Sequence, residues 1–160
     1  MQIRIRATGQ VLLQHEWEKW VAQTYAKSLS GITEEAVNRF ESDIVFEGPQ
    51  ATGGTVYQYS QRDGVEQLDG KWYTKYILGP VFTDGETTAA EQEAAYKAMK
   101  DAEQAANVRR SRTEMLKDCD WTQIADSTAD KAVWATYRQA LRDITTQSGF
   151  PWTITWPTQP

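Results

Sequence analysis

The sequence predicts an α+β protein with a mixed N-terminal region, a long connecting helix and a C-terminal helical hairpin that ends in an extended, aromatic and proline-rich tail. Two observations carry most of this prediction. Short apolar runs separated by turn residues fill the first half, whereas Ala89–Lys117 contains neither Gly nor Pro. We therefore expect a mixed α+β domain with a β-meander over 1–82, a helical connector over 83–108 and a C-terminal module over 109–160.

The strand signals of the first half are short alternating or continuous apolar runs. They lie at 3–5, 11–13, 44–46, 55–61, 65–68 and 71–78. Asp63-Gly64 and Asp69-Gly70 separate the last three, and Asp-Gly favours two-residue hairpin turns. An antiparallel β-meander is therefore expected over 51–82. One face of its last strand should carry Trp72, Thr74, Tyr76 and Leu78.

Two short helices are expected before the meander. Apolar residues recur at helical spacing from Trp17 to Leu29, and Ser30-Gly31 should end this helix. Thr33 should cap a second helix that runs through Phe40, because its hydroxyl can accept a backbone N–H at the helix start.

The long helix from Ala89 to about Lys117 should begin with a capping box of Thr88 and Glu91. It is rich in strong helix formers, and at 1.5 Å per residue it would be about 43 Å long. Its thin apolar stripe consists of Ala95, Met99, Ala102, Ala106 and Arg109. A rod of this length cannot be buried in so small a domain. We expect it either to span between two parts or to form a homo-oligomer by packing against copies of itself.

The last helix should start near Ser127, which has capping-box spacing to Asp130, and should end at Ser148-Gly149. Its buried face is expected to hold Val133, Trp134, Tyr137, Ala140, Leu141 and Ile144. The tail after Gly149 should be extended, because proline is excluded from helix interiors and central strands. Left free, its aromatic side chains would expose a large apolar surface. We therefore expect the tail to dock on the hairpin over 112–147.

Charge and composition exclude several classes of function. The formal net charge of -5 argues against general nucleic-acid binding, which requires a basic surface. The basic cluster over 109–112 has acidic neighbours in Glu103 and Glu114, and is expected to be a solvated helix face. No stretch reaches the roughly 20 apolar residues of a membrane span. The first residues lack the apolar segment of a signal peptide, so we expect no membrane association.

Catalytic and metal sites are not expected. The single Cys, Cys119, and the single His, His15, exclude an internal disulfide and the usual structural zinc sites. Glu34 and Glu35 fit a helix start, and Asp63 and Asp69 fit turns, which explains both carboxylate pairs without a glycosidase. His15 should lie at the surface or in a cap, and Cys119 in a half-buried turn. We expect no catalytic residue, no metal and no cofactor.

Four blocks in the last third of the chain are familiar. They read Arg-Arg-Ser-Arg-Thr-Glu-Met-Leu-Lys-Asp-Cys-Asp-Trp-Thr-Gln from Arg109, Trp-Ala-Thr-Tyr-Arg-Gln-Ala-Leu-Arg-Asp from Trp134, Gly-Phe-Pro-Trp from Gly149, and a closing Trp156-Pro157. In this order they resemble the C-terminal module of the phage tail assembly chaperone family, over about 105–160. A looser resemblance to the start of related tail proteins lies in 8–11, in 46–50 and in the strand of Trp72.

Residues of this module are the candidate interaction or structural motif. They are Arg109, Arg112, Asp120, Trp121, Trp134, Tyr137, Arg138, Leu141, Arg142, Asp143, Phe150, Pro151, Trp152, Trp156 and Pro157.

Individual roles can be assigned to some of them. Asp120 can cap the turn into Trp121, and Arg138, Arg142 and Asp143 share a helix face. Arg142 could clamp the tail by bonding its carbonyls, since guanidinium presents several donors in a fixed fork. A single aromatic cluster is expected from Trp121, Trp134, Tyr137, Trp152 and Trp156.

The resemblance implies a non-enzymatic structural or assembly protein of a bacteriophage tail that contacts other phage tail proteins. Its expected location is the tail of the virion, and the host cytoplasm during assembly. The alternative is a receptor-binding or glycan-binding module at the tail fibre or tail tip. In that case exposed aromatic side chains would stack on sugars, and the candidates are Tyr57, Tyr59, Tyr73 and Tyr76.

Overall fold

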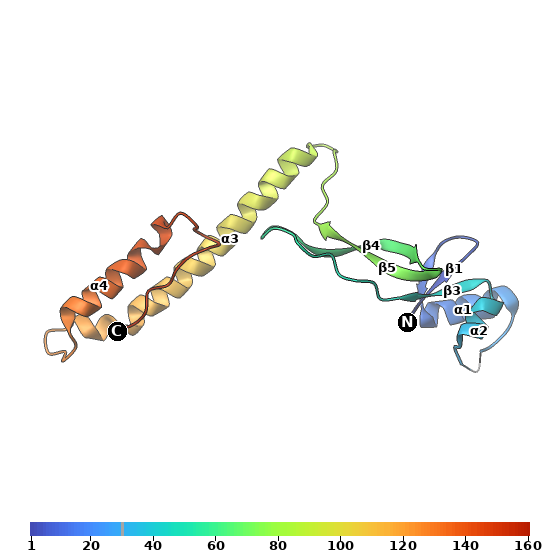
Figure 1. Cartoon of the computed structure of the whole chain (residues 1–160), viewed down its shortest axis with the longest axis horizontal. Coiled ribbons are helices and arrows are strands. Elements are labelled where there is room, and N and C mark those ends of the chain that lie inside the picture. The colour runs from blue at the N-terminus through green and yellow to red at the C-terminus, as the bar shows by residue number, and fades with distance from the viewer. Residues whose placement is uncertain (30) are drawn as a thin grey trace. The chain divides into compact units, whose positions relative to one another are not determined.

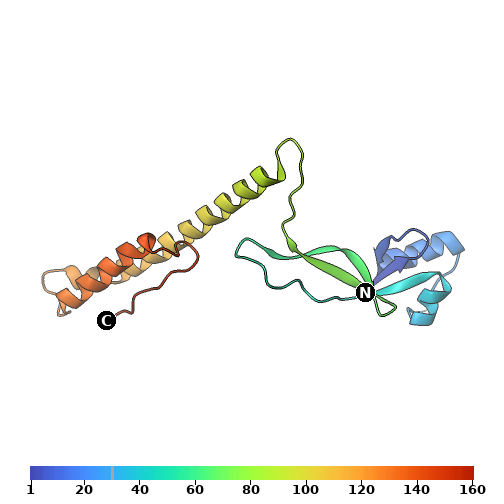
Figure 2. The ribbon, with the colours of Figure 1, turned by 45° about the horizontal axis from the view of Figure 1, so that its top comes forward.

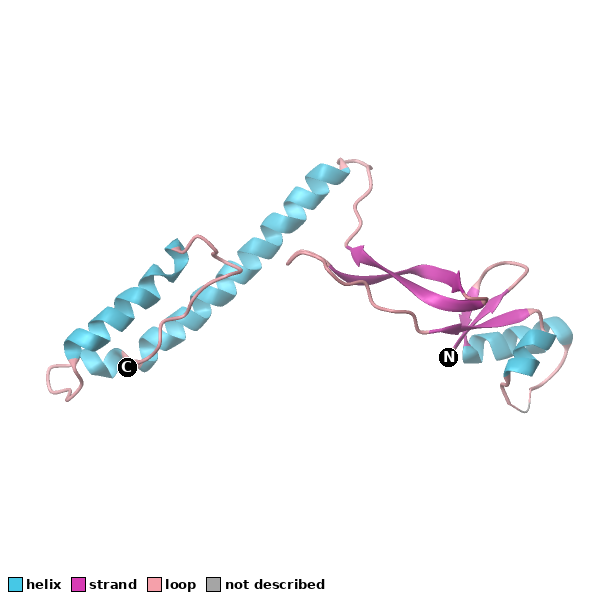
Figure 3. Cartoon of the chain, viewed as in Figure 1, coloured by secondary structure: helices cyan, strands magenta, loops and turns pink. Residues whose placement is uncertain are grey.

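A computed structural model describes residues 1–29 and 31–160. It confirms the α+β class, with helices and strands in one chain (Figures 1 and 3). The chain divides into two compact units, Met1–Val81 and Phe82–Pro160. No helix in the described part of the chain has the length and apolarity that a membrane span requires.

The first unit is built on a five-stranded mixed sheet with the order β2-β1-β3-β5-β4. The strands are β1 (Gln2–Ile5), β2 (Val11–Leu13), β3 (Ser42–Phe46), β4 (Tyr59–Leu68) and β5 (Lys71–Gly79). Neighbours are antiparallel except β3 and β5, which pair in parallel with Val45 opposite Trp72. The strands of 51–82 therefore do not form a separate antiparallel sheet, because β5 pairs with the N-terminal strand β3.

The meander predicted from two Asp-Gly turns is a single hairpin. Asp69-Gly70 is the turn between β4 and β5, with φ of 49° and 78° as a two-residue turn with two positive φ angles requires. Asp63-Gly64 lies inside β4, where the pairing register shifts between Arg62 and Val65. The prediction of a turn there is wrong, because Asp-Gly also suits the extra residue of a β-bulge, and Gly64 has φ of 78°.

Helices α1 (Gln14–Tyr25) and α2 (Glu34–Arg39) share one hydrophobic core with the sheet. Its buried members are Ile3, Ile5, Trp17, Val21, Val37 and Phe40. The indole N–H of Trp17 donates to the Ser42 hydroxyl at 3.0 Å, and that hydroxyl donates to the Phe40 carbonyl at 2.9 Å. The largest buried side chain of the unit therefore has a satisfied polar group.

The ends of these two helices only partly follow the prediction. Helix α1 ends at Tyr25, where Ala26 adopts a left-handed conformation with φ of 51°, so the expected continuation to Leu29 is wrong. Leu29 still packs against the core. The predicted break at Ser30 lies outside the described residues. The predicted cap is confirmed, since the Thr33 hydroxyl accepts the N–H of Ala36 at 3.1 Å.

The second unit contains the long helix α3 (Ala89–Asp118) and the shorter α4 (Lys131–Arg142). Two 3-10 helices follow them, η1 (Asp120–Gln123) and η2 (Asp143–Thr146). The capping box of α3 is confirmed: the Thr88 hydroxyl accepts the Glu91 N–H, and the Glu91 carboxylate accepts the Thr88 N–H. The Thr88 N–H bond, and a weaker effect of the Thr88 hydroxyl, which donates to the same carboxylate at 2.8 Å, lower the pKa of Glu91.

Helix α4 begins later than predicted. Its N-cap is Asp130, whose carboxylate accepts the N–H groups of Ala132 and Val133 at 3.0 and 3.2 Å. Ser127 instead accepts the N–H of Ala129 in the preceding turn. The α-helix also ends at Arg142, and η2 continues the chain to Thr146. Asp130, three residues after Ser127, is therefore the N-cap in place of the predicted serine.

The buried face of α3 differs from the predicted stripe. Its buried residues are Ala105 and Val108. The predicted stripe is exposed, namely Ala95, Met99, Ala102, Ala106 and Arg109. Alanine gives only a weak periodic signal, so the packing of α4 and the tail decides which face is covered. Val133 on α4 is likewise 47% exposed rather than buried.

Candidate functional site

The C-terminal tail docks within its own unit, as predicted. The buried core of this unit consists of Val108, Cys119, Trp134, Tyr137, Leu141 and Ile144. Phe150, Ile154 and Trp156 of the tail pack against it, and the tail runs back along α3 (Figure 2). Burial raises the pKa of Tyr137 above its ordinary value, with smaller contributions from Cys119 and Asp118.

Part of the predicted aromatic cluster is present. Trp134 makes edge-on ring contacts with Trp121 at 5.9 Å and with Tyr137 at 5.7 Å. Trp156 packs on the same core. Trp152 is anchored differently, because its indole N–H donates to the Asp101 carboxylate on α3 at 2.5 Å. The tail is therefore bound to both helices, whereas the prediction placed it only on the hairpin of 112–147.

Arg138 joins α4 to the end of α3. Its guanidinium donates to the Leu116 carbonyl at 2.8 Å and to the Cys119 sulfur at 3.0 Å, and lies 2.7 Å from an Asp120 oxygen. Burial lowers the pKa of Arg138, but the bonds to Asp120 and Cys119 outweigh burial and raise it overall. Cys119 is fully buried rather than half-buried.

The predicted capping role of Asp120 is wrong, because η1 has no side-chain cap and the Asp120 carboxylate pairs with Arg138. Arg138 and Arg142 are one turn apart on α4 and Asp143 follows Arg142, but their side chains have different environments. Arg138 has a side-chain exposure of 12% and bonds inside the unit, whereas Arg142 and Asp143 are exposed. The turn that ends α3 brings its carbonyls and Asp120 to Arg138, and this long-range placement has no signal in the local sequence.

Gln147, not Arg142, clamps the tail. The Gln147 amide donates to the Thr155 carbonyl at 2.9 Å and accepts the Thr155 N–H at 2.8 Å. The Arg142 guanidinium makes a 3.5 Å bond to Gln139 on its own helix. An amide can both donate and accept, so it can satisfy both polar groups of one residue in an extended chain. Nothing in the sequence distinguishes Gln147 from other exposed glutamines.

Gln147→Ala is expected to loosen the tail. It removes two hydrogen bonds, each worth about 0.5–1.5 kcal/mol, so the unit should lose about 1–3 kcal/mol of stability. Hydrogen exchange at the Thr155 amide should speed up. The control is Gln139→Ala, which removes a glutamine that bonds locally to Asp143 at 2.9 Å. Equal protection of Thr155 in the two variants would show that Gln147 does not hold the tail.

The remaining motif residues lie around this docked tail. The Arg109 guanidinium carbon lies 5.4 Å from the centre of the Phe150 ring. The Nε of Arg112 is buried and has no hydrogen-bond partner in the part of the chain that the structure describes. Leu141 is fully buried, and Pro151 and Pro157 are half-buried. The structure thus brings the tail residues together with α3, and Arg109 at the end of the predicted stripe lies beside the tail.

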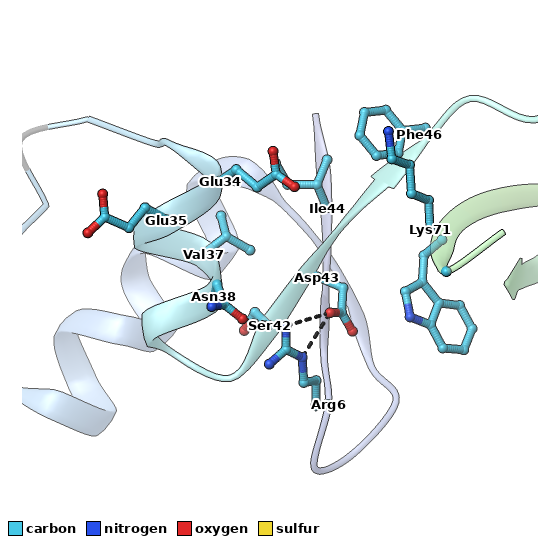
Figure 4. A pocket seen from close by; sticks show the side chains of 12 residues that line it. Arg6, Glu34, Glu35, Val37, Asn38, Ser42, Asp43, Ile44, Phe46 and Lys71 are labelled. Atoms are coloured by element: carbon cyan, nitrogen blue, oxygen red, sulfur yellow. Dashed lines mark hydrogen bonds and ion pairs between the residues drawn. The ribbon is translucent and has the colours of Figure 1, made fainter. Parts of the chain in front are cut away.

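The first unit has a polar cleft of about 230 Å³ between α2 and the sheet. Arg6 bonds Asp43 and Asn38 across its floor, each at 2.8 Å (Figure 4). Phe46 and Lys71 form one wall, and the Lys71 amine lies 5.6 Å from the ring centre. The Arg6–Asp43 ion pair therefore lies inside the cleft. Within 1–29 and 31–160, no group of His, Cys, Asp or Glu is placed to hold a metal ion.

The tyrosines of the alternative prediction do not share one environment. Tyr59 is 54% exposed on the outer strand β4. Tyr73 contacts the Phe46 ring at 5.7 Å, and the Tyr76 hydroxyl donates to Glu47. Tyr73 and Tyr76 therefore have contacts inside the unit, and Tyr59 is the most exposed of these three.

Residues 105–160 match the family model of the phage tail assembly chaperone protein. The match begins inside α3 and continues through η1, α4 and the docked tail. It confirms the resemblance carried by the four sequence blocks. Neither a curated protein nor a solved structure shows a significant match to the chain.

Proposed function

We propose that this protein acts in the assembly of a bacteriophage tail by binding other tail proteins, without catalysing a reaction. The observation that carries the proposal is the match of residues 105–160 to the phage tail assembly chaperone protein family. The matched residues form a packed region in which Gln147 holds the tail, and Asp101, which lies just before the match, bonds Trp152. A rigid module of this kind offers a surface for partners.

Three large apolar residues that are exposed in the matched module support partner binding. Trp121 in η1 is 52% exposed, Ile124 at the C-terminal end of η1 is exposed, and Val133 is exposed in the first turn of α4. Trp121 contacts Trp134, which neighbours Val133 in the chain. Exposed tryptophan within an apolar patch is typical of binding hot spots between proteins.

Trp121→Ala is expected to weaken capture of other tail proteins by the tagged chain about tenfold or more, the scale of a hot-spot residue. The free energy of unfolding should change little, because half of the Trp121 side chain is already in water. Tyr59→Ala is the matched control, an aromatic residue of similar exposure in the first unit. Unchanged capture by Trp121→Ala, or loss with Tyr59→Ala alone, would contradict this assignment and favour the receptor-binding alternative.

A second copy of the chain is a further partner that we propose, through α3. The stripe of Ala95, Met99, Ala102 and Ala106 is exposed on this helix. Glu91 lies near its start and Arg109 near its end, so charges would match in an antiparallel pair. Sedimentation equilibrium should show a dimer that Ala102→Arg dissociates, and a wild-type monomer at every concentration would contradict it.

Purified protein is expected to release no sugar or peptide from host envelope polysaccharide or peptidoglycan. The proposal assigns no nucleophile–base pair and no metal to the chain. Reducing-sugar and amine assays measure this directly. Release that a single carboxylate substitution abolishes would overturn the non-enzymatic proposal.

The proposed location is the tail of the virion, with a stage in the host cytoplasm during assembly. Mass spectrometry of purified particles separates the two roles that remain within this proposal. A structural component should be present in mature virions, whereas a factor that acts only in assembly should be absent from them.

A further inference from the structure

A shallow groove of about 490 Å³ lies between α3 and the docked tail. Its lining includes Gln104, Asn107, Ser111, Trp152, Ile154 and Trp156. One wall is polar and comes from α3, and the other is mainly apolar and comes from the tail. None of the lining residues carries a charge, although the protein has a net charge of -5.

The polar wall is a row of hydrogen-bonding side chains on one face of α3. Gln104, Asn107 and Ser111 are three and four residues apart, so they are spaced about 4.5 and 6 Å along the helix axis. Each can donate and accept a hydrogen bond. The hydrogen bonds that hold the tail come from Asp101 and Gln147 and not from these three side chains. The wall therefore offers donors and acceptors over roughly 10 Å.

The apolar wall is held in place before any partner arrives. Trp152 is anchored to Asp101, and Thr155, between Ile154 and Trp156, is bonded through both backbone groups to Gln147. Trp152 and Trp156 are only half-buried, and both line the groove. A preformed wall reduces the entropy lost when a partner binds.

We propose that this groove binds an extended, uncharged segment of another tail protein, one that contains proline or other apolar residues. The inference rests on the proposed function and adds the site and the chemistry of the partner. An extended chain advances about 3.3 Å per residue, so about three residues span the polar wall and present alternating N–H and C=O groups to it. Proline and apolar side chains pack well on tryptophan rings.

The neutral lining decides against charged ligands. A nucleic acid or a phosphorylated peptide requires cations to compensate its charge, and the groove lining supplies none. Burying a charged group against this lining would carry a large desolvation cost, whereas an uncharged segment can exchange its water for the amide and hydroxyl groups of α3.

The test uses the full chain and synthetic overlapping peptides that cover the other tail proteins of the same phage. Bound peptides should be uncharged and rich in proline and apolar residues. Asn107→Arg, which places a bulky cation in the groove, should weaken peptide binding about tenfold or more. Thr113→Arg makes the same charge change at an exposed position of α3 outside the groove, and should bind like the wild type.

Nuclear magnetic resonance gives a direct reading of the site. The indole N–H signals of Trp152 and Trp156 should shift on peptide addition, while that of the buried Trp17 should not. Equal peptide binding by Asn107→Arg and wild type would overturn the proposed site. An oligosaccharide probe, chitohexaose, tests the alternative ligand, and its binding in the groove without any peptide binding would also overturn the proposal. If intact tail proteins are still captured in a Trp121-dependent way, the proposed function survives that failure. If no tail protein is captured, both proposals fail.

Discussion

Trp17→Ala is expected to destabilise the first unit by about 3–5 kcal/mol, which is a large share of the stability of a small domain. Trp17 is fully buried between α1 and the sheet. Removal of this side chain would leave a cavity, and it would also remove the indole N–H that donates to the Ser42 hydroxyl. Hydrogen exchange should then show lost protection across 1–46, while α3 and α4 keep theirs.

The conservative variant and an exposed control make this prediction specific. Trp17→Phe keeps most of the buried ring and should cost less than Trp17→Ala. His15→Ala changes an exposed residue of the same helix and should stay within about 0.5 kcal/mol of the wild type. Simultaneous loss of protection in α3 and α4 would show that the units do not fold independently.

The division of the second unit into a connector over 83–108 and a module over 109–160 stays a prediction.

Arg138→Met is expected to destabilise the second unit by about 2–3 kcal/mol, the range of hydrogen bonds to charged groups. Methionine preserves helix propensity and side-chain length, but it leaves the Leu116 carbonyl and Cys119 without their guanidinium donor. The ion pair adds little to this figure, because the Asp120 side chain is 64% exposed. Thermal unfolding followed by the helical circular dichroism signal measures the change.

Arg142→Met is the matched control for this variant. It makes the same substitution one helical turn later, at an exposed side chain whose bond to Gln139 is 3.5 Å long. Its melting temperature should remain close to that of the wild type. If both variants melt together at the wild-type temperature, packing of the methionine compensates for the lost bonds, and Arg138 is not the residue that holds α4 to α3.

Features that depend on residues close together in the chain could be predicted from the sequence alone. Thr33, the Thr88–Glu91 capping box and the Asp69-Gly70 turn all act within about four residues, so their signals are contained in short windows. The apolar face of α4 repeats large side chains, and large side chains give strong periodicity. The blocks of 109–157 likewise carried the resemblance that the family match then confirmed.

Features that depend on contacts between residues distant in the chain became visible only in the folded structure. Asp63-Gly64 can form a turn or a bulge, and the continuous pairing of β4 with β5 selects the bulge. The long helix could bury several faces of small residues, and the docked tail selects the one with Val108. Arg138 and Gln147 are assigned by partners 22 and 8 residues away in the chain. Such distant partners leave no periodic or local signal, because only folding places them within hydrogen-bonding distance.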